Sequence, residues 1–173
     1  MLIETERTRI RHFKADDFHD LFEILSDPMV MENTEPPYDA EKCRAFLDDF
    51  CVEKKKGLAV VHKQADKVIG YVLFAPYGEA DVYEIGWIFN KAYWRQGYAF
   101  EAIGALLKFA FLELNTHKVF AEAIDAVKSV KLMEKLGMKW EGVQRQQTRD
   151  NDGAWRDLYF YGLLREEYTD RQV

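Results

Sequence analysis

The residues best suited to chemistry lie around one turn, Trp94-Arg95-Gln96-Gly97-Tyr98-Ala99. Residues 82–89 before it are rich in β-branched and aromatic types, which predicts a strand. Residues 99–114 after it carry apolar side chains at helical spacing, which predicts a helix. A helix start offers unpaired backbone N–H groups and a positive dipole end, and Gly97 has no Cβ to block a ligand. The turn is therefore predicted to bind a phosphate-bearing ligand; the alternative is an ordinary helix start of an α/β protein.

Glu84 is the carboxylate within the otherwise apolar stretch 82–89. A buried carboxylate is costly unless it is paired, and burial raises its pKa toward the range useful to a general base. Glu84 is therefore a candidate base. The alternative is a glutamate at the end of a strand, paired with a surface lysine or arginine.

The elements that must position these residues follow from the apolar periodicity. Pro28 is expected to end the first helix, Asp39 to cap the second, and Gly57 and Gly137 to act as C-caps. The stretch between Pro28 and Asp39 is expected to be a loop. Strands are predicted at 8–13, 58–62, 68–75, 82–89, 118–124, 140–148 and 155–164, and helices at 15–25, from Asp39 to the Lys54–Gly57 segment, 99–114 and 125–136.

Length and composition narrow the class of protein. A chain of 173 residues with 48% hydrophobic residues predicts one globular domain spanning 1–173. A net charge of −6 argues against nucleic acid as the main partner and is compatible with a cationic amine. Cys43 and Cys51, eight residues apart in a predicted helix, are expected to be buried and unbridged. No metal-ligand spacing, signal core or membrane-length apolar run is present, so we expect a cytoplasmic protein with no metal and no membrane.

The stretch from Trp94 to Ala99 resembles the [Gln/Arg]-x-x-Gly-x-[Gly/Ala] segment with which the GNAT N-acetyltransferase superfamily grips the pyrophosphate of acetyl-CoA. Gly97 and Ala99 match its last two fixed positions, and Trp94 replaces the usual Gln or Arg. The wider strings Glu84-Ile85-Gly86-Trp87 and Tyr93 to Ala99 resemble the RimJ/RimL-like branch, which acetylates protein N-termini and small amines. The order of predicted elements is also similar over nearly the whole chain. The resemblance implies an α/β (α+β) GNAT fold: a central mixed, mostly antiparallel twisted sheet, flanked by helices, with splayed central strands.

The resemblance also implies where acetyl-CoA would bind. The pantetheine arm would pair with the exposed backbone of the splayed strand, as an added strand does, and Arg95 could add a charged contact to phosphate or simply face solvent. The expected cofactor-binding residues are Trp87, Ile88, Phe89, Trp94, Arg95, Gln96, Gly97, Tyr98, Ala99 and Ser129.

Glu84 falls where several GNAT enzymes hold their catalytic glutamate. Ser129, in a stretch that resembles the family's Asn-x-x-Ser and Glu-Lys-Leu-Gly-Phe blocks, would donate a hydrogen bond to the leaving sulfur; the alternative is a first-turn serine bonded to backbone. Ala126 stands where the family has Asn, and Asp125 could act as the helix cap instead. Four aromatic residues are expected near the acceptor cleft, as pocket walls or cation-stacking rings or as ordinary core and rim residues: Tyr38, Tyr77, Tyr83 and Trp155.

The function that the resemblance implies is an acetyl-CoA-dependent N-acetyltransferase. It would move an acetyl group directly, in a ternary complex, to a primary amine: a protein N-terminal α-amine or a small-molecule amine. A homodimer would fit the family. The alternative is a protein with the same fold that binds CoA without catalysis and works as a sensor or interaction partner.

Overall fold

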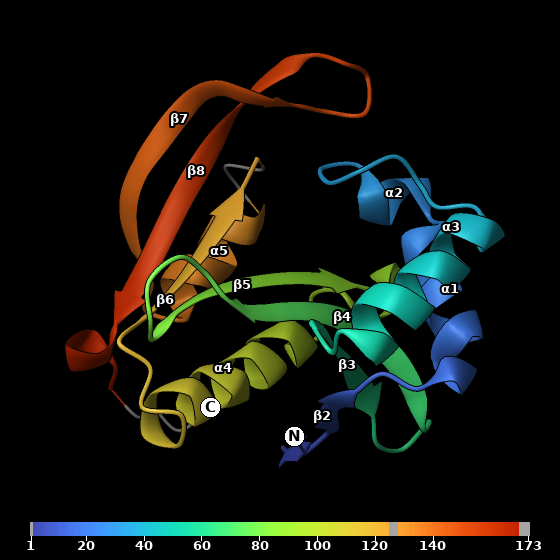
Figure 1. Cartoon of the computed structure of the whole chain (residues 1–173), viewed down its shortest axis with the longest axis horizontal. Coiled ribbons are helices and arrows are strands. Elements are labelled where there is room, and N and C mark those ends of the chain that lie inside the picture. Colours follow the sequence, from blue (N-terminus) through green and yellow to red (C-terminus); the bar gives the residue numbers. More distant parts are fainter. Residues whose placement is uncertain (1, 125–127, 170–173) are drawn as a thin grey trace.

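The computed structural model describes residues 2–124 and 128–169, which form one twisted sheet of eight strands in the order β1-β2-β3-β4-β5-β6-β8-β7 (Figure 1). Within these residues, β5 and β6 run parallel and the other neighbouring pairs run antiparallel. The predicted mixed, mostly antiparallel sheet is thus confirmed. The strands are β1 (Leu2–Glu4), β2 (Thr8–His12), β3 (Gly57–His62), β4 (Lys67–Pro76), β5 (Val82–Phe89), β6 (Lys118–Ala123), β7 (Lys139–Arg149) and β8 (Trp155–Leu164).

Helices cover both faces of the sheet (Figure 1). In the described residues they are α1 (Phe18–Leu25), α2 (Pro28–Met31), α3 (Ala40–Ala45), α4 (Tyr98–Leu112) and α5 (Lys128–Lys135). The segment Phe46–Glu53 prolongs α3 as a π-helix, and short 3-10 turns lie at Ala15–Asp17, Lys91–Tyr93 and Arg165–Glu167. None of the helices in this part of the chain is long and apolar enough to cross a membrane.

The main core lies between the sheet and the helices α4 and α5. The apolar positions spaced along α4 are buried there, and α5 adds Val130 and Met133. From the strands, Ile69, Ile85 and Val119 pack against them. The helical periodicity of 99–114 therefore identified the buried face of α4 correctly at Ile103, Leu106, Leu107 and Ala110. It was wrong at Leu114, which lies beyond the end of α4 and is 40% exposed.

A second core lies on the opposite face, beneath α1 and α3. It contains Cys43 and Cys51, which are fully buried and free. Burial raises the pKa of the Cys43 thiol to about 11 and that of Cys51 to about 12. The prediction that these cysteines act as small buried hydrophobes is confirmed.

The pairing of β5 shows where the sheet opens. β5 pairs with β4 from Tyr83 to Phe89 but with β6 only through Val82, Tyr83 and Glu84. β6 then continues along β8 as far as Ala123. A gap therefore opens between residues 85–89 of β5 and 121–123 of β6, which confirms the splayed central strands.

Three local predictions differ from the structure or fall outside it, and one strand was not expected from the sequence. Pro28 does not lead into a loop: it is the first residue of α2, whose N-terminus the Asp27 side chain caps. Gly57 is not a C-cap, because it begins β3 while Lys55 takes the left-handed conformation, with φ of 54°. Strand β1 was not predicted. Asp125 and Ala126 lie outside the described residues, so the predicted helix over 125–136 is confirmed only from Lys128.

Gly57 is required for packing, since a Cβ there would lie 2.7 Å from Cys51 Sγ and 2.8 Å from the Tyr71 ring. Gly57→Ala should therefore lower the free energy of unfolding by about 1–3 kcal/mol through overpacking, measured by urea denaturation. Gly86→Ala is the matched control, because its nearest neighbour is Leu73 Cβ at an ordinary 3.7 Å. Equal stability of the two variants would show that the close contact at Gly57 relaxes freely.

Candidate functional site

The 94–99 turn has the backbone geometry of an anion site. Arg95 and Gly97 have positive φ, 58° and 86°, while Gln96 between them does not. Two left-handed residues so close together bend the chain tightly, and the N–H groups of such a turn can face an anion. Gly97 is also the N-cap of α4, so the first N–H groups of that helix and its dipole add to the same site.

Side chains at the turn serve mainly to hold it. Trp94, which replaces the family's Gln or Arg, donates its indole N–H to the Phe89 carbonyl at 2.7 Å, and Gln96 donates to the Ala92 carbonyl at 2.8 Å. Arg95 is exposed, and Ala99 packs against the main core. Any anion at this turn would therefore meet mostly backbone N–H groups, with Arg95 as an exposed cation beside them.

The open side of β5 supplies a second binding feature. Trp87, Ile88 and Phe89 pair with β4 on one side and have no β6 partner on the other. Backbone N–H and C=O groups alternate between the two sides of a strand. Asn90 donates to the Ile69 carbonyl of β4, so Ile88 also faces β4, whereas Trp87 and Phe89 face the gap, where the Phe89 carbonyl accepts the Trp94 indole N–H. An extended ligand can therefore pair along this edge at Trp87. The edge leads directly from Glu84 toward the 94–99 turn.

Glu84 stands at the closed end of the gap, as the last β5 residue that pairs with β6, opposite Phe120. Its neighbours Tyr83 and Ile85 pack into the main core, so alternation along the strand turns Glu84 to the opposite face. Glu84 is half-buried, and burial is the cause that raises the pKa of its carboxyl. No Lys or Arg among the described residues forms an ion pair with it, which disfavours the paired-surface alternative.

Glu122 is a second carboxylate on this face and was not singled out from the sequence. Phe120 lies opposite Glu84, so alternation places Glu122, two residues further along β6, on the same face. Although Glu122 is exposed, partial burial raises its pKa, and the nearby Glu84 charge raises it further. Reading the alternation of 118–124 together with 82–89 could have found it.

Ser129 lies in the first turn of α5, half-buried, one helical turn before the core residue Met133. Residues four apart share a helix face, so Ser129 is on the side of α5 that packs toward the sheet. β6 ends at Ala123, and α5 begins five residues later. Ser129 therefore lies at the start of the first described helix after β6.

The four predicted acceptor-site aromatics have different surroundings. Tyr77 is exposed and meets Phe120 edge-on at 5.0 Å, which brings it to the Glu84 face. Tyr83 stacks on Phe74 at 4.7 Å in the main core, on the other face of β5. The structure therefore does not bring Tyr83 to Glu84.

The other two aromatics lie in different surroundings, one buried and one exposed. Tyr38 is buried in the second core, and its hydroxyl donates to Glu35 at 2.9 Å. Trp155 is exposed at the start of β8, with the Arg149 guanidinium 4.0 Å from its ring centroid. Neither is shown to touch Glu84.

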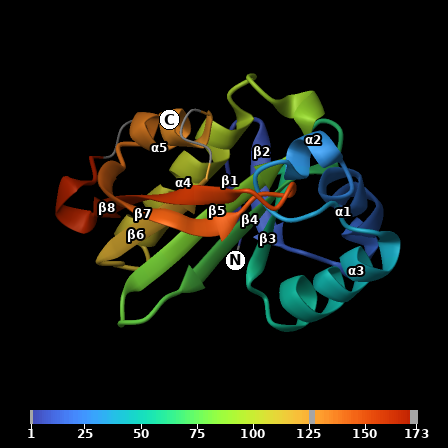
Figure 2. The same cartoon turned by 90° about the horizontal axis from the view of Figure 1, so that it is seen from above.

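The hairpin of β7 and β8 extends across the sheet toward α2 (Figure 2). At its tip, the Asn151 side-chain amide donates to the Met31 carbonyl at 2.9 Å and to the Glu35 carbonyl at 3.2 Å. These bonds join the hairpin to the end of α2 and to the segment that follows it. The face that carries Glu84 is thus bordered by the β7–β8 hairpin and by the segment around α2, and the two are in contact at Asn151.

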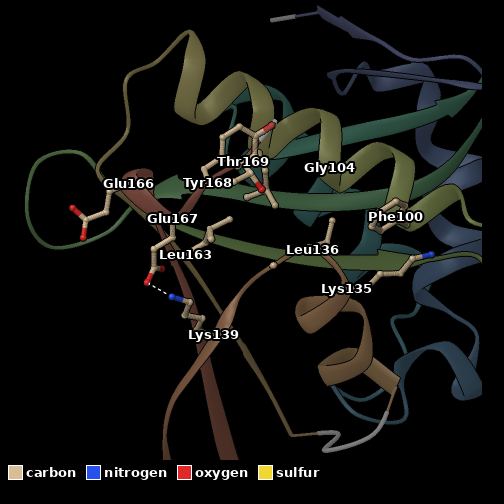
Figure 3. Close-up of a pocket in the computed structure, with 12 residues that line it drawn as sticks. Phe100, Gly104, Lys135, Leu136, Lys139, Leu163, Glu166, Glu167, Tyr168 and Thr169 are labelled. Atoms are coloured by element: carbon tan, nitrogen blue, oxygen red, sulfur yellow. Dashed lines mark hydrogen bonds and ion pairs between the residues drawn. The ribbon is translucent and has the colours of Figure 1, made fainter. Parts of the chain in front are cut away.

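A hollow of about 410 Å³ lies elsewhere, between α4, the end of α5 and the segment 165–169 (Figure 3). Phe100, Leu107 and Leu136 line it, and the ion pair of Lys139 with Glu167, at 2.6 Å, lies at its edge. It is on the α4 side of the sheet, and the raised-pKa carboxylates are on the other. The hollow is therefore not lined by Glu84, the candidate base. No group of three or more His, Cys, Asp or Glu that could hold a metal ion occurs in the described parts of the chain.

Comparisons with known proteins place this geometry in context. A family model described as an acetyltransferase (GNAT) domain matches residues 7–139. The relative named "Uncharacterized N-acetyltransferase YnaD", from Bacillus subtilis (strain 168), is 34% identical over 171 residues, covering 98% of this chain and 100% of that protein. The crystal structure of a GNAT-family acetyltransferase from Bacillus anthracis matches with a TM-score of 0.88 and 32% identity, covering 96% of this chain and 99% of that one. A ribosomal-protein-S5-alanine acetyltransferase from Vibrio fischeri shares the fold, with a TM-score of 0.81, 22% identity and coverage of 98% and 99%.

The carboxylate pair gives a direct prediction about titration. Carboxyl ¹³C NMR should show both Glu84 and Glu122 titrating above the ordinary glutamate pKa of about 4.3, because burial disfavours their charged forms. Glu84→Gln should then lower the pKa of Glu122, since it removes the neighbouring negative charge. An ordinary pKa for Glu84 would contradict its burial, and an unchanged Glu122 would contradict their proximity.

Proposed function

The chain belongs to the GNAT acetyltransferase family, and we propose that it transfers the acetyl group of acetyl-CoA directly to a primary amine, in a ternary complex. The observation that carries this proposal is the gap between β5 and β6, with the Glu84 carboxylate, which has no ion pair among the described residues, at its closed end and the 94–99 turn beyond its open end. A donor with a phosphate group at one end and a reactive thioester at the other fits this arrangement.

The donor would lie along β5. Its pyrophosphate would bind the N–H groups of the turn at Gly97, and its pantetheine arm would run along Trp87, Ile88 and Phe89 and pair with the backbone that faces the gap at Trp87. The five residue-to-residue steps from Glu84 to Phe89 span about 17 Å of extended strand. The thioester would then reach the closed end of the gap, where Glu84 lies.

Transfer requires a neutral amine, because an ammonium nitrogen has no lone pair with which to attack. Glu84 would accept a proton from the ammonium, directly or through water. The amine nitrogen would then bond to the thioester carbonyl carbon, and the carbon–sulfur bond would break. As the tetrahedral intermediate collapses, the nitrogen gives up its second proton to solvent and the departing thiolate takes up one, which leaves a neutral amide and the CoA thiol. The Ser129 hydroxyl, in the first turn of α5, would donate a hydrogen bond to the sulfur.

The acceptor would be a cationic amine. Glu84 and Glu122 place two carboxylates on one face of the sheet, and the chain has a net charge of −6; both favour a positively charged molecule. Tyr77 could stack on such a cation from the same face. A protein N-terminal α-amine and a small-molecule amine both satisfy these requirements, in keeping with the chain's resemblance to the RimJ/RimL-like branch.

The functional test uses Glu84→Gln, with release of free thiol from acetyl-CoA measured on a panel of amines. Removing a general base typically costs about 10²–10⁴ in rate, so kcat on an alkyl amine at pH 7 should fall by that factor with CoA affinity almost unchanged. The loss should shrink as pH rises, because the free amine, whose conjugate acid has a pKa of about 10.4, then accumulates without a base. Wild-type rate should in turn fall with acidity as the Glu84 carboxylate, whose pKa is raised, becomes protonated.

Glu122→Gln is the matched control, because it makes the same carboxylate-to-amide change on the same face, one strand away. We expect it to cost far less, since Glu122 is exposed and Glu84 is at the gap. A large loss in Glu122→Gln with none in Glu84→Gln would assign the base to Glu122. Tight CoA binding with no turnover on any amine or peptide would instead favour a CoA-binding sensor.

A further inference from the structure

We infer that Arg7 is a positioning residue for the cofactor: it holds the 94–99 turn in the conformation that binds the pyrophosphate. This inference rests on the proposed function, since it takes the turn to be the pyrophosphate site. It adds a residue from the N-terminal segment, between β1 and β2, to a site otherwise built from β5 and α4.

Arg7 bonds to both sides of the turn. Its Nη1 donates to the Gln96 carbonyl at 2.9 Å, and its Nε donates to Glu101 Oε2 at 2.6 Å. Its backbone N–H also donates to Glu101 Oε1 at 2.8 Å. One residue thus connects the middle of the turn to the first turn of α4.

The bond to Gln96 controls the direction of the next N–H group. A trans peptide unit is planar, so the carbonyl of Gln96 and the N–H of Gly97 point in opposite directions. By holding the carbonyl, Arg7 turns the Gly97 N–H away from itself, toward the outer side where an anion can approach. Gly97 permits this arrangement, because a Cβ there would lie 3.2 Å from Arg7 Nη2.

The bond to Glu101 removes an electrostatic obstacle. Glu101 lies in the first turn of α4 and its side chain is only 12% exposed, so its charge is poorly screened. Burial acts to raise the pKa of Glu101, but hydrogen bonds from Thr5 and Arg7 outweigh it and hold that pKa below the ordinary value. Glu101 is therefore ionised beside the proposed pyrophosphate site and would repel it. The Arg7 guanidinium neutralises that charge.

Tyr98 extends the support to the neighbouring strands. The Arg7 guanidinium lies 4.3 Å from the centre of its ring, and its hydroxyl is 3.0 Å from His62 Nε2 at the end of β3. His62 Nδ1 accepts the Ala65 N–H at 3.1 Å, so the neutral imidazole carries its proton on Nε2 and donates it to Tyr98. The turn is thereby tied to two segments far from it in sequence.

The test compares Arg7→Ala with Arg9→Ala, measuring CoA affinity by calorimetry. Arg9→Ala is the matched control, because it removes the same charge from the adjacent strand β2. The salt-bridge partners of Arg9 are Glu4 and Asp66, which lie outside the 94–99 turn. Arg7→Ala should weaken CoA binding by about 10- to 100-fold, as expected when charge-assisted hydrogen bonds are lost. Arg9→Ala should bind as the wild type does. In kinetics, Arg7→Ala should raise KM for acetyl-CoA and leave kcat and the amine KM nearly unchanged.

Two further variants keep the inference testable if Arg7→Ala folds poorly. Arg7→Lys keeps the charge but lacks the forked guanidinium that serves Gln96 and Glu101 together, so its affinity should fall between wild type and Arg7→Ala. In the double variant Arg7→Ala with Glu101→Gln, part of the lost affinity should return, because the unpaired carboxylate is gone.

The outcomes separate this inference from the proposed function. Gly97→Val places a branched residue at a positive φ of 86° and should abolish CoA binding in a folded protein. If Gly97→Val loses binding while folded Arg7→Ala and Arg7→Lys bind as tightly as Arg9→Ala, the role of Arg7 is overturned and the site stands. If the wild type does not bind CoA, or Gly97→Val binds it equally well, the proposed site itself fails.

Discussion

The site depends on one constraint, the end of pairing between β5 and β6 at Glu84. Both strands run in the same direction, so their divergence opens the sheet at their carboxyl ends, where α/β sheets commonly bind ligands. Each strand leads into a helix, α4 or α5, whose N-terminus therefore lies at the open end. One interruption in the ladder thus provides an unpaired backbone edge, an anion-binding turn and a carboxylate at the closed end.

The same constraint places Glu84 where its ionisation lowers the stability of the folded protein. A carboxylate whose pKa is raised by folding is less stable ionised in the folded protein than in the unfolded chain. Its ionisation therefore lowers stability as pH rises through that range. A lysine or arginine partner would remove this penalty, but it would also hold the carboxylate ionised and make it a weaker base. The absence of an ion pair to Glu84 within the described residues suits a base better than it suits a structural residue.

Local patterns predicted much of the fold and part of the site. The β-branched and aromatic composition of 82–89 and the Gly97 turn located β5, α4 and Glu84, because these features depend on neighbouring residues. Gly57 was misassigned because its role, contact with Cys51 and Tyr71, is tertiary. Arg7 could not be found from the sequence, since it meets Gln96 across a separation of 89 residues. Tyr83 was expected at the acceptor face, but its neighbours in the pleat place it in the core.

The most direct measurement of the central claim is a ¹H–¹⁵N NMR titration of the wild-type protein with CoA. If the gap and the turn hold the cofactor, the largest amide shifts should fall on Gly97, Tyr98 and the open edge of β5 from Trp87 to Phe89. Shifts confined to the hollow around Leu107, Leu136 and Tyr168, with Gly97 unmoved, would contradict the account.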